Sequence, residues 1–277
     1  MIPAGFEYHR PADLVSALGL LKEHGDEARV VAGGHSLIPM MKLRMAELGH
    51  LVDLQDIGEL KGIKLGDGTA TIGAMTTQAE LIAHDGLAEA LPILREASLQ
   101  IADPQVRYMG TIGGNVANGD PGNDMPGLMQ CLNASYELAG PDGTRKVAAR
   151  EFYEAAYFTA REDVEILTRV VIPVPASGTG YAYVKQKRKI GDYATAAAAV
   201  LVGGGSASVA MTNLADTPIW SEKAGAALAK GDADGCVAAM LAAIDPQDDM
   251  RGPVAFKKHV AAVVLRRAVD SALSRKS

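Results

Sequence analysis

The stretch Arg107-Tyr-Met-Gly-Thr-Ile-Gly-Gly-Asn-Val-Ala-Asn-Gly-Asp-Pro-Gly-Asn-Asp124 decides how the rest of this sequence is interpreted. It places Gly110 before Thr111 and the pair Gly113-Gly114 before Asn115. Glycine adopts positive φ readily and lets a ligand approach bare backbone. Successive backbone N–H groups aimed into one concavity bind phosphate oxygens. The stretch is therefore a candidate phosphate-binding loop, although a single Gly-Gly pair is also typical of an ordinary turn.

A second glycine pair lies upstream, in Arg29-Val-Val-Ala-Gly-Gly-His-Ser36. A short β-branched run stops at Gly33-Gly34 and is followed by His35 and by Ser36, which we expect to cap the next helix. The spacing is not G-x-G-x-x-G, so a Rossmann dinucleotide site is not supported. Two Gly-Gly loops, each with a hydroxyl and a polar side chain, favour a ligand that carries two phosphates.

The composition limits the classes of protein to consider. The 277 residues are 48% hydrophobic and can bury a sizeable core, and 27 basic against 33 acidic residues give a net charge of −6. This charge argues against nucleic acid or an anionic membrane as a partner. Cys131 and Cys236 are far apart, so we expect two reduced thiols and no iron–sulfur cluster held by this chain. No signal peptide or membrane-spanning stretch is recognised, and we expect a cytoplasmic protein.

The order of predicted elements divides the chain into three units of an α+β protein. Residues 1–55 contain strand, helix and strand at the spacing of a small βαβ subdomain. Residues 56–176 contain hairpin signals, including Gly66-Asp67-Gly68, and predict a larger subdomain built on an antiparallel sheet. After a Pro/Ser/Gly-rich linker, residues 177–277 predict an antiparallel sheet followed by three helices.

Several local signals refine this division. We expect a Met-rich helix over residues 37–48, a capping box at Thr77, and a helix that begins at the acidic Asp124. Asp103-Pro104 is expected to end a helix and lead into the second glycine loop. The glycines at 203–205 are expected to form a hairpin turn and to bind no phosphate.

The motifs Ala32-Gly-Gly-His-Ser36 and Thr111-Ile-Gly-Gly-Asn115 resemble those of the FAD-binding subunits of the molybdenum hydroxylases, in particular the medium subunit of the aerobic carbon monoxide dehydrogenases. The similarity covers essentially the whole chain. It implies a two-subdomain FAD-binding fold with a C-terminal flavoprotein domain. It also implies that the bound diphosphate is that of FAD.

The candidate cofactor site combines both loops with residues carried over by the resemblance. The glycine backbone is predicted to hold the pyrophosphate, and Asp124 to accept a hydrogen bond from a ribose or ribityl hydroxyl. Lys185 is predicted to raise the flavin potential and Tyr193 to pack on the ring, whereas His35 is interpreted as a loop residue and not a general base. No catalytic or metal-ligating residue is predicted. The predicted cofactor-binding residues are Val31, Ala32, Gly33, Gly34, His35, Ser36, Ile101, Gly110, Thr111, Ile112, Gly113, Gly114, Asn115, Asp120, Asp124, Leu167, Lys185 and Tyr193.

The resemblance implies an electron-transfer subunit. It would take electrons from a [2Fe-2S] cluster on a small partner and pass them to an external acceptor such as quinone, with a molybdopterin centre on a large partner. A dimer of heterotrimers follows from the same resemblance, with contact to a membrane only through the acceptor. Two alternatives stay open: a stand-alone FAD-dependent reductase of similar fold, and a non-redox nucleotide-binding scaffold.

Overall fold

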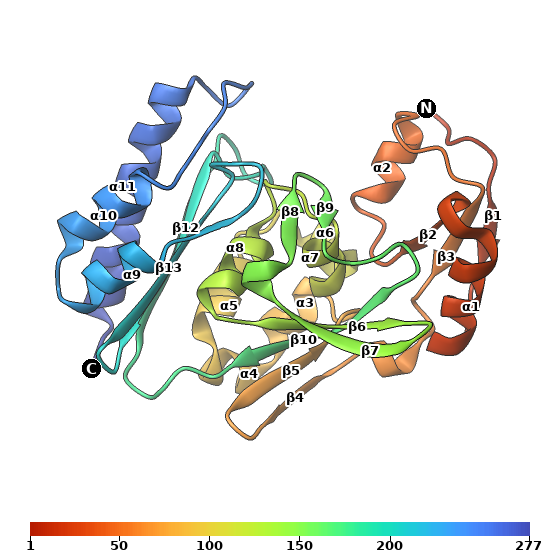
Figure 1. The fold of residues 1–277 in the computed structure, drawn as a ribbon, viewed down its shortest axis with the longest axis horizontal. Helices are drawn as coiled ribbons and strands as arrows, with labels where there is room; N and C mark the ends of the chain where they lie inside the picture. The colour runs from red at the N-terminus through yellow and green to blue at the C-terminus, as the bar shows by residue number, and fades with distance from the viewer.

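The computed structural model describes residues 1–277 and contains three main sheets in chain order, with the two termini at opposite ends of the molecule (Figure 1). No helix has the length and apolar character that crossing a bilayer requires. The α+β fold class predicted from the sequence is confirmed.

The N-terminal unit is a three-stranded parallel sheet in the order β1-β3-β2. Its elements are β1 (Glu7–His9), α1 (Leu14–His24), β2 (Ala28–Val31), α2 (Leu37–Lys42) and β3 (His50–Asp53). The expected βαβ unit is β2-α2-β3. Strand β1 was not predicted, because it has only three residues and two of their side chains are exposed.

The prediction of a helix over residues 37–48 is wrong in length. The α2 helix ends at Lys42, and Arg44 takes a left-handed conformation with φ of 59°. Ser36 occupies the N-cap position, but its side chain makes no capping hydrogen bond, so the predicted capping role is also wrong. The Ser36 hydroxyl is therefore available to a ligand.

The middle unit is a five-stranded antiparallel sheet in the order β4-β5-β10-β6-β7. Asp67 and Gly68 have φ of 51° and 69°, so the turn between β4 and β5 has the left-handed residues expected of an Asp-Gly hairpin. The strands are β4 (Ile63–Gly66), β5 (Thr69–Gly73), β6 (Ser135–Gly140), β7 (Gly143–Ala148) and β10 (Ile166–Pro173), with a separate hairpin of β8 (Tyr153–Ala155) and β9 (Phe158–Thr159). The helices are α3 (Gln78–Ala83), α4 (Asp85–Ala90), α5 (Pro92–Ser98), α6 (Pro104–Met109), α7 (Ile112–Ala117) and α8 (Asp124–Cys131).

Two predictions for this unit are corrected. Asp103-Pro104 begins the helix α6, because Pro104 occupies the first turn and the Asp103 carboxylate accepts a hydrogen bond from the Val106 N–H. Gly113 and Gly114 lie inside the short helix α7 and not in a turn. The Thr77 capping box is present, as expected.

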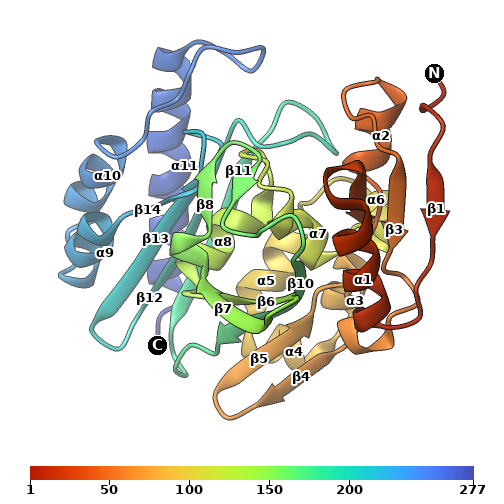
Figure 2. The ribbon, with the colours of Figure 1, turned by 45° about the vertical axis from the view of Figure 1, so that its right-hand side comes forward.

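The C-terminal unit is a four-stranded antiparallel sheet, as expected, in the order β11-β12-β13-β14. Helices α9–α11 cover one face of this sheet, and α5 and α8 of the middle unit cover the other, as Figures 1 and 2 both show. Gly204 and Gly205 have positive φ and form the expected hairpin turn. The elements are β11 (Gly180–Gln186), β12 (Ala196–Gly203), β13 (Ser206–Thr212), β14 (Ile219–Trp220), α9 (Glu222–Ala229), α10 (Ala233–Leu241) and α11 (Val254–Ser274).

The middle and C-terminal units share one hydrophobic core. Tyr183 and Ala197 of the C-terminal sheet belong to the same buried cluster as Leu128 of α8. The parallel sheet has a separate small core around Val52. The division at residues 55 and 176 stays a prediction. At residue 176 the separate sheets support a boundary, whereas the shared core does not.

Candidate functional site

A cleft of about 1180 Å³ runs between the N-terminal parallel sheet and the rest of the molecule. Gln78 and four segments, within residues 26–48, 101–124, 157–163 and 185–193, line it. Ordinary small-molecule sites are about 300–1,000 Å³. The cleft therefore has room for a long ligand with several chemical groups.

The two glycine motifs touch each other at the floor of this cleft. A Cβ atom added to Gly33 would lie 2.2 Å from the carbonyl oxygen of Met109, and one added to Gly114 would lie 3.5 Å from the Cβ of Ala32. Contacts this short leave no space for a side chain at Gly33. Among the glycines of the two motifs, only Gly34 has positive φ, at 71°. Glycine is thus required in these motifs mainly because the two backbone segments approach each other closely. Only Gly34 is required for a left-handed backbone conformation.

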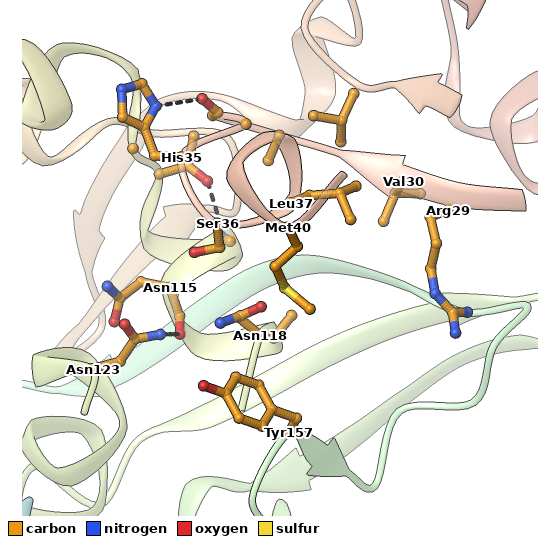
Figure 3. A pocket seen from close by; sticks show the side chains of 18 of the residues that line it. Arg29, Val30, His35, Ser36, Leu37, Met40, Asn115, Asn118, Asn123 and Tyr157 are labelled. Atoms are coloured by element: carbon orange, nitrogen blue, oxygen red, sulfur yellow. Dashed lines mark hydrogen bonds between the residues drawn. The ribbon is translucent and has the colours of Figure 1, made fainter. Parts of the chain in front are cut away.

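The first loop presents backbone donors that the protein does not use. The N–H groups of Gly33, Gly34, His35 and Ser36 donate to no acceptor within the chain. The His35 ring nitrogen Nδ1 lies 2.7 Å from the Gly33 carbonyl oxygen, and in Figure 3 this ring turns away from Ser36 and Asn115. His35 therefore belongs to the internal bonding of the loop. Consecutive free N–H groups beside a left-handed residue form an anion-binding nest.

The second motif does not provide a second backbone cradle, and that prediction is corrected. The N–H groups of Ile112 and Gly113 donate to the carbonyl oxygens of Thr76 and Ala74, both at 2.9 Å. The N–H of Gly114 donates to the Thr111 hydroxyl oxygen at 3.0 Å, capping α7. These donors are consumed by packing and capping, so the motif can offer a ligand only its side chains.

Two side chains of the second motif keep a free donor. Asn115 accepts a hydrogen bond from the Met125 N–H through its Oδ1, while Asn123 donates to the Asn115 carbonyl oxygen at 2.8 Å. The Nδ2 amide of Asn115 makes no hydrogen bond in the protein, and the Thr111 hydroxyl keeps its own proton to donate. Both residues line the cleft.

A buried ion pair between Lys185 and Asp124 lines the cleft away from the first glycine loop. Lys185 Nζ lies 2.8 Å from Asp124 Oδ2, and the two side chains are only 1% and 5% exposed. The Tyr183 hydroxyl donates to the other oxygen of Asp124 at 2.5 Å. Burial, reinforced by the charge of Asp124, raises the pKa of Tyr183 well above its usual value. Strand alternation places Tyr183 and Lys185 on the same face of β11, as expected from the sequence.

Four of the predicted residues do not line the cleft. Ile112 and Leu167 are buried in the main core, and Gly113 packs directly against Ala74. The Asp120 carboxylate accepts a hydrogen bond from the Gly122 N–H at 2.8 Å and serves the local turn. The structure places the other predicted residues on the cleft: Val31, Ala32, Gly33, Gly34, His35, Ser36, Ile101, Gly110, Thr111, Gly114, Asn115, Asp124, Lys185 and Tyr193.

The sequence interpretation missed several polar residues of the wall. Asn118 and Asn123 lie within the stretch that drew attention first, and their polarity in a Gly-rich segment was an available signal. Gln78 gave no signal, because it follows a helix cap and could equally face solvent. In the structure Gln78 is 2% exposed, and both atoms of its side-chain amide lack a partner within the protein.

Family models identify both parts of the chain. The model described as "FAD binding domain in molybdopterin dehydrogenase" matches residues 4–175, and the "CO dehydrogenase flavoprotein C-terminal domain" matches residues 181–272. The chain belongs to the flavoprotein medium-subunit family of the molybdenum hydroxylases. This confirms the resemblance found in the two glycine motifs.

Relatives of this flavoprotein family match over nearly full length. The carbon monoxide dehydrogenase medium chains of Afipia carboxidovorans and Hydrogenophaga pseudoflava are 58% and 42% identical, and each match covers 99% of both chains. The reconstituted CO dehydrogenase from Oligotropha carboxidovorans superposes with a TM-score of 0.96 over 99% of this chain and 100% of that one, at 58% identity. Quinoline 2-oxidoreductase from Pseudomonas putida 86 superposes with a TM-score of 0.93 over 99% of both chains, at 30% identity.

The residues of the cleft fit FAD, the cofactor of this flavoprotein family. The free N–H groups from Gly33 to Ser36 suit the oxygens of its diphosphate. The unpaired amide of Gln78 and the free donor of Asn115 suit its hydroxyl and carbonyl groups. The Lys185–Asp124 ion pair is shielded from water and presents an oriented dipole to the cleft.

Tyr193 should make the folding stability of this flavoprotein depend on pH in the alkaline range. Tyr193 is 40% exposed, so its burial is only partial. This partial burial, and next the negative charge of Asp120, raise the pKa of Tyr193 to about 12, whereas an unfolded tyrosine titrates near about 10. The folded chain therefore holds this proton more tightly than the unfolded chain. Its contribution to stability is complete below about pH 10 and is lost as the pH rises toward about 12.

We accordingly expect the free energy of unfolding of the cofactor-free chain to fall between about pH 10 and 12, and to fall less steeply in Tyr193→Phe. Denaturant unfolding at several pH values measures this slope, and phenolate absorbance follows the tyrosine itself. An unchanged slope in Tyr193→Phe would show that Tyr193 titrates normally.

Proposed function

We propose that this chain carries FAD as the electron-transfer subunit of a carbon monoxide dehydrogenase-type complex. Electrons would come from a [2Fe-2S] cluster on a small subunit, after oxidation of carbon monoxide at a molybdopterin centre on a large subunit, and would leave to an acceptor such as quinone. We propose a cytoplasmic dimer of heterotrimers. The observation that carries the proposal is the first loop, with its unused N–H groups set against the second glycine motif inside the cleft.

The residues of the chain would bind and orient the cofactor. When bound, FAD supplies the redox chemistry, since electron transfer belongs to the isoalloxazine and not to side chains. The N–H groups from Gly33 to Ser36 hold the diphosphate, and the Thr111 hydroxyl and Asn115 amide donate to the same ligand. The Thr111 side chain is only 3% exposed, so its hydrogen bond to the ligand would act in a lower dielectric than water.

Lys185 would set the electrostatics of the flavin end. A cation beside the ring favours the reduced cofactor, which carries extra negative charge. The Asp124 carboxylate at 2.8 Å offsets much of that charge, so the pair acts as an oriented dipole and not as an isolated cation. This gives Asp124 a second role beside the predicted bond to a hydroxyl group.

Membership of a multisubunit complex is supported by the similarity to medium chains over 99% of both lengths. The cysteines are consistent with this division of labour, because both are free and buried and cannot hold a four-thiolate cluster. A stand-alone reductase would bind FAD but would need no such partners. A scaffold would bind no redox cofactor and would also need no such partners.

Affinity purification of the tagged chain from its native host tests the proposal. We expect flavin absorbance, iron, sulfide and molybdenum in one complex that oxidises carbon monoxide. A yellow chain that elutes alone under all conditions would favour the reductase alternative. A colourless chain that takes up no FAD would contradict the proposal altogether.

Gln78 offers a test of the binding site that separates folding from cofactor retention. Because its buried amide has no partner in the chain, replacing it by an apolar group of similar shape should not weaken folding. We expect Gln78→Met to leave the free energy of unfolding of the cofactor-free chain unchanged or to raise it by about 1 kcal/mol.

The same Gln78→Met variant should bind FAD about tenfold more weakly, a loss of about 1.4 kcal/mol. Fluorescence titration of the cofactor-free chain with FAD measures the affinity, and chemical denaturation measures the stability. Parallel losses of stability and of FAD affinity would mean that Gln78 has only a structural role.

A further inference from the structure

Three histidines from three different elements lie together in the N-terminal unit, outside the FAD cleft. His9 ends β1, His24 ends α1 and His50 begins β3. One ring nitrogen from each lies within 4.8 Å of those of the other two. His9 Nε2 and His50 Nδ1 are 3.0 Å apart. The FAD site uses none of these side chains.

The backbone fixes where the three residues sit. Parallel pairing of β1 with β3 sets Glu7 opposite His50 and His9 opposite Val52. Helix α1 stops directly after His24, where Gly25 takes φ of 52° and its N–H donates to the Leu21 carbonyl oxygen. Sheet register and helix length therefore fix the backbone positions from which the three rings converge.

The cluster contains more ring nitrogens than the protein can pair. One hydrogen bond can form between His9 and His50, whereas the His24 ring forms none and stacks on the His50 ring with centroids 3.6 Å apart. The nearest carboxylate is that of Glu7, 3.6 Å from His50 Nδ1 and 74% exposed. Half-buried neutral imidazoles with free nitrogens are the commonest metal ligands in proteins.

We propose that His9, His24 and His50 bind one divalent transition-metal ion of the zinc type, with water as the fourth ligand. Zinc binds imidazole nitrogen at about 2.0–2.1 Å in tetrahedral geometry, which sets nitrogens about 3.3 Å apart. The His9–His50 separation of 3.0 Å is close to that value. Imidazole ligands with an open water position suit zinc, copper and nickel better than magnesium or calcium.

His24 is the ligand that moves. A metal lies near the plane of each ring that binds it, so the stacked His24 and His50 rings, inclined by only 7°, cannot both bind without rotation. No side-chain hydrogen bond holds His24, and it lies at the C-terminal end of α1, where the helix dipole favours a cation. His9 also lines a shallow depression with Ser16 and Glu23, which lets an ion enter from solvent.

The bound ion would tie α1 to β1 and β3. Strand β3 pairs with β2, which leads directly into the first glycine loop. The site would therefore stabilise the unit that carries the FAD loop, without touching FAD itself.

Zinc binding to the purified, FAD-loaded protein tests this site after treatment with a chelator. We expect equilibrium dialysis with metal analysis to give one zinc per chain in the wild type. His24→Leu should weaken zinc binding at least tenfold. The matched control is His259→Leu, which removes an exposed histidine on α11 and should bind zinc like the wild type.

Cobalt serves as a spectroscopic probe of the same site. We expect the visible bands of tetrahedral cobalt in the wild type and in His259→Leu, and their loss in His24→Leu. A wild type that binds no zinc, or a His24→Leu variant that binds it as tightly as the wild type, overturns the proposal. FAD content is measured in parallel and should be equal in all three proteins, so failure of the metal site leaves the proposed function untouched.

Discussion

Gly114→Val is expected to weaken FAD binding at least a hundredfold, about 2.7 kcal/mol, while the chain still folds. An added Cβ would lie 2.9 Å from the Thr111 hydroxyl oxygen and 3.5 Å from the Cβ of Ala32. Valine would displace the hydroxyl and separate the two motifs beside the loop that we propose holds the diphosphate. Because Gly114 faces the open cleft and not the core, the folded chain can accommodate the added methyl groups.

Two other glycines show whether a loss of FAD reflects the cleft or the fold. Gly19 also lies in a helix but is exposed, with nothing within 4 Å, so Gly19→Val should bind FAD normally. Gly113 is buried, and its Cβ would lie 2.5 Å from the Cβ of Ala74. Gly113→Val should therefore destabilise the chain itself, by about 1–3 kcal/mol or more.

The measurements are flavin content after gel filtration and fluorescence titration with FAD, together with circular dichroism for folding. Wild-type affinity in Gly114→Val would remove the diphosphate from this part of the cleft. Equal losses in Gly114→Val and Gly19→Val would indicate a general effect of valine in helices.

The sequence predicted the regular parts of the fold because their local signals agree with their environment. The strands from β10 to β13 are long and apolar, and their turns contain Gly or Pro at the expected places. The wrong predictions fall where one sequence pattern is compatible with two different local structures. Asp-Pro can end a helix or begin one, and at residues 103–104 it begins α6. Strand β1 depends on pairing with β3, which no local pattern reveals.

The motifs predicted most residues of the cleft, but not which of their backbone donors stay free. The sequence cannot show that the N–H of Gly113 is consumed by Ala74, since that contact joins segments far apart in the chain. The same holds for Gln78, whose importance follows only from its burial without a partner. Long-range contacts decide which donors stay free, and free donors decide what the cleft can bind.

Lys185→Met is expected to cost about 3–5 kcal/mol of folding stability, because it leaves the Asp124 carboxylate buried and unpaired. Asp124 would keep only the hydrogen bond from the Tyr183 hydroxyl among its present side-chain partners. Chemical denaturation of the cofactor-free chain measures the loss. The matched control is Arg169→Met, which breaks the pair with Glu137 on β10 and β6. That arginine is 44% exposed, so its loss should cost at most about 1 kcal/mol.

A double-mutant cycle with Asp124→Asn isolates the pair from its surroundings. In that background Lys185→Met should cost less than in the wild type by at least about 1 kcal/mol, because no carboxylate is left unpaired. Additive losses would mean that the two charges do not stabilise each other.

The reduction potential of bound FAD, measured in the same four proteins of the cycle, tests the pair independently of stability. Lys185→Met should lower the potential, since it removes a cation and exposes the flavin to the charge of Asp124. Asp124→Asn should raise it, and the double variant should lie between the two. Potentials that do not move in either single variant would place the flavin ring away from this end of the cleft. The stability result would then stand alone, and the pair would be a structural feature of the wall.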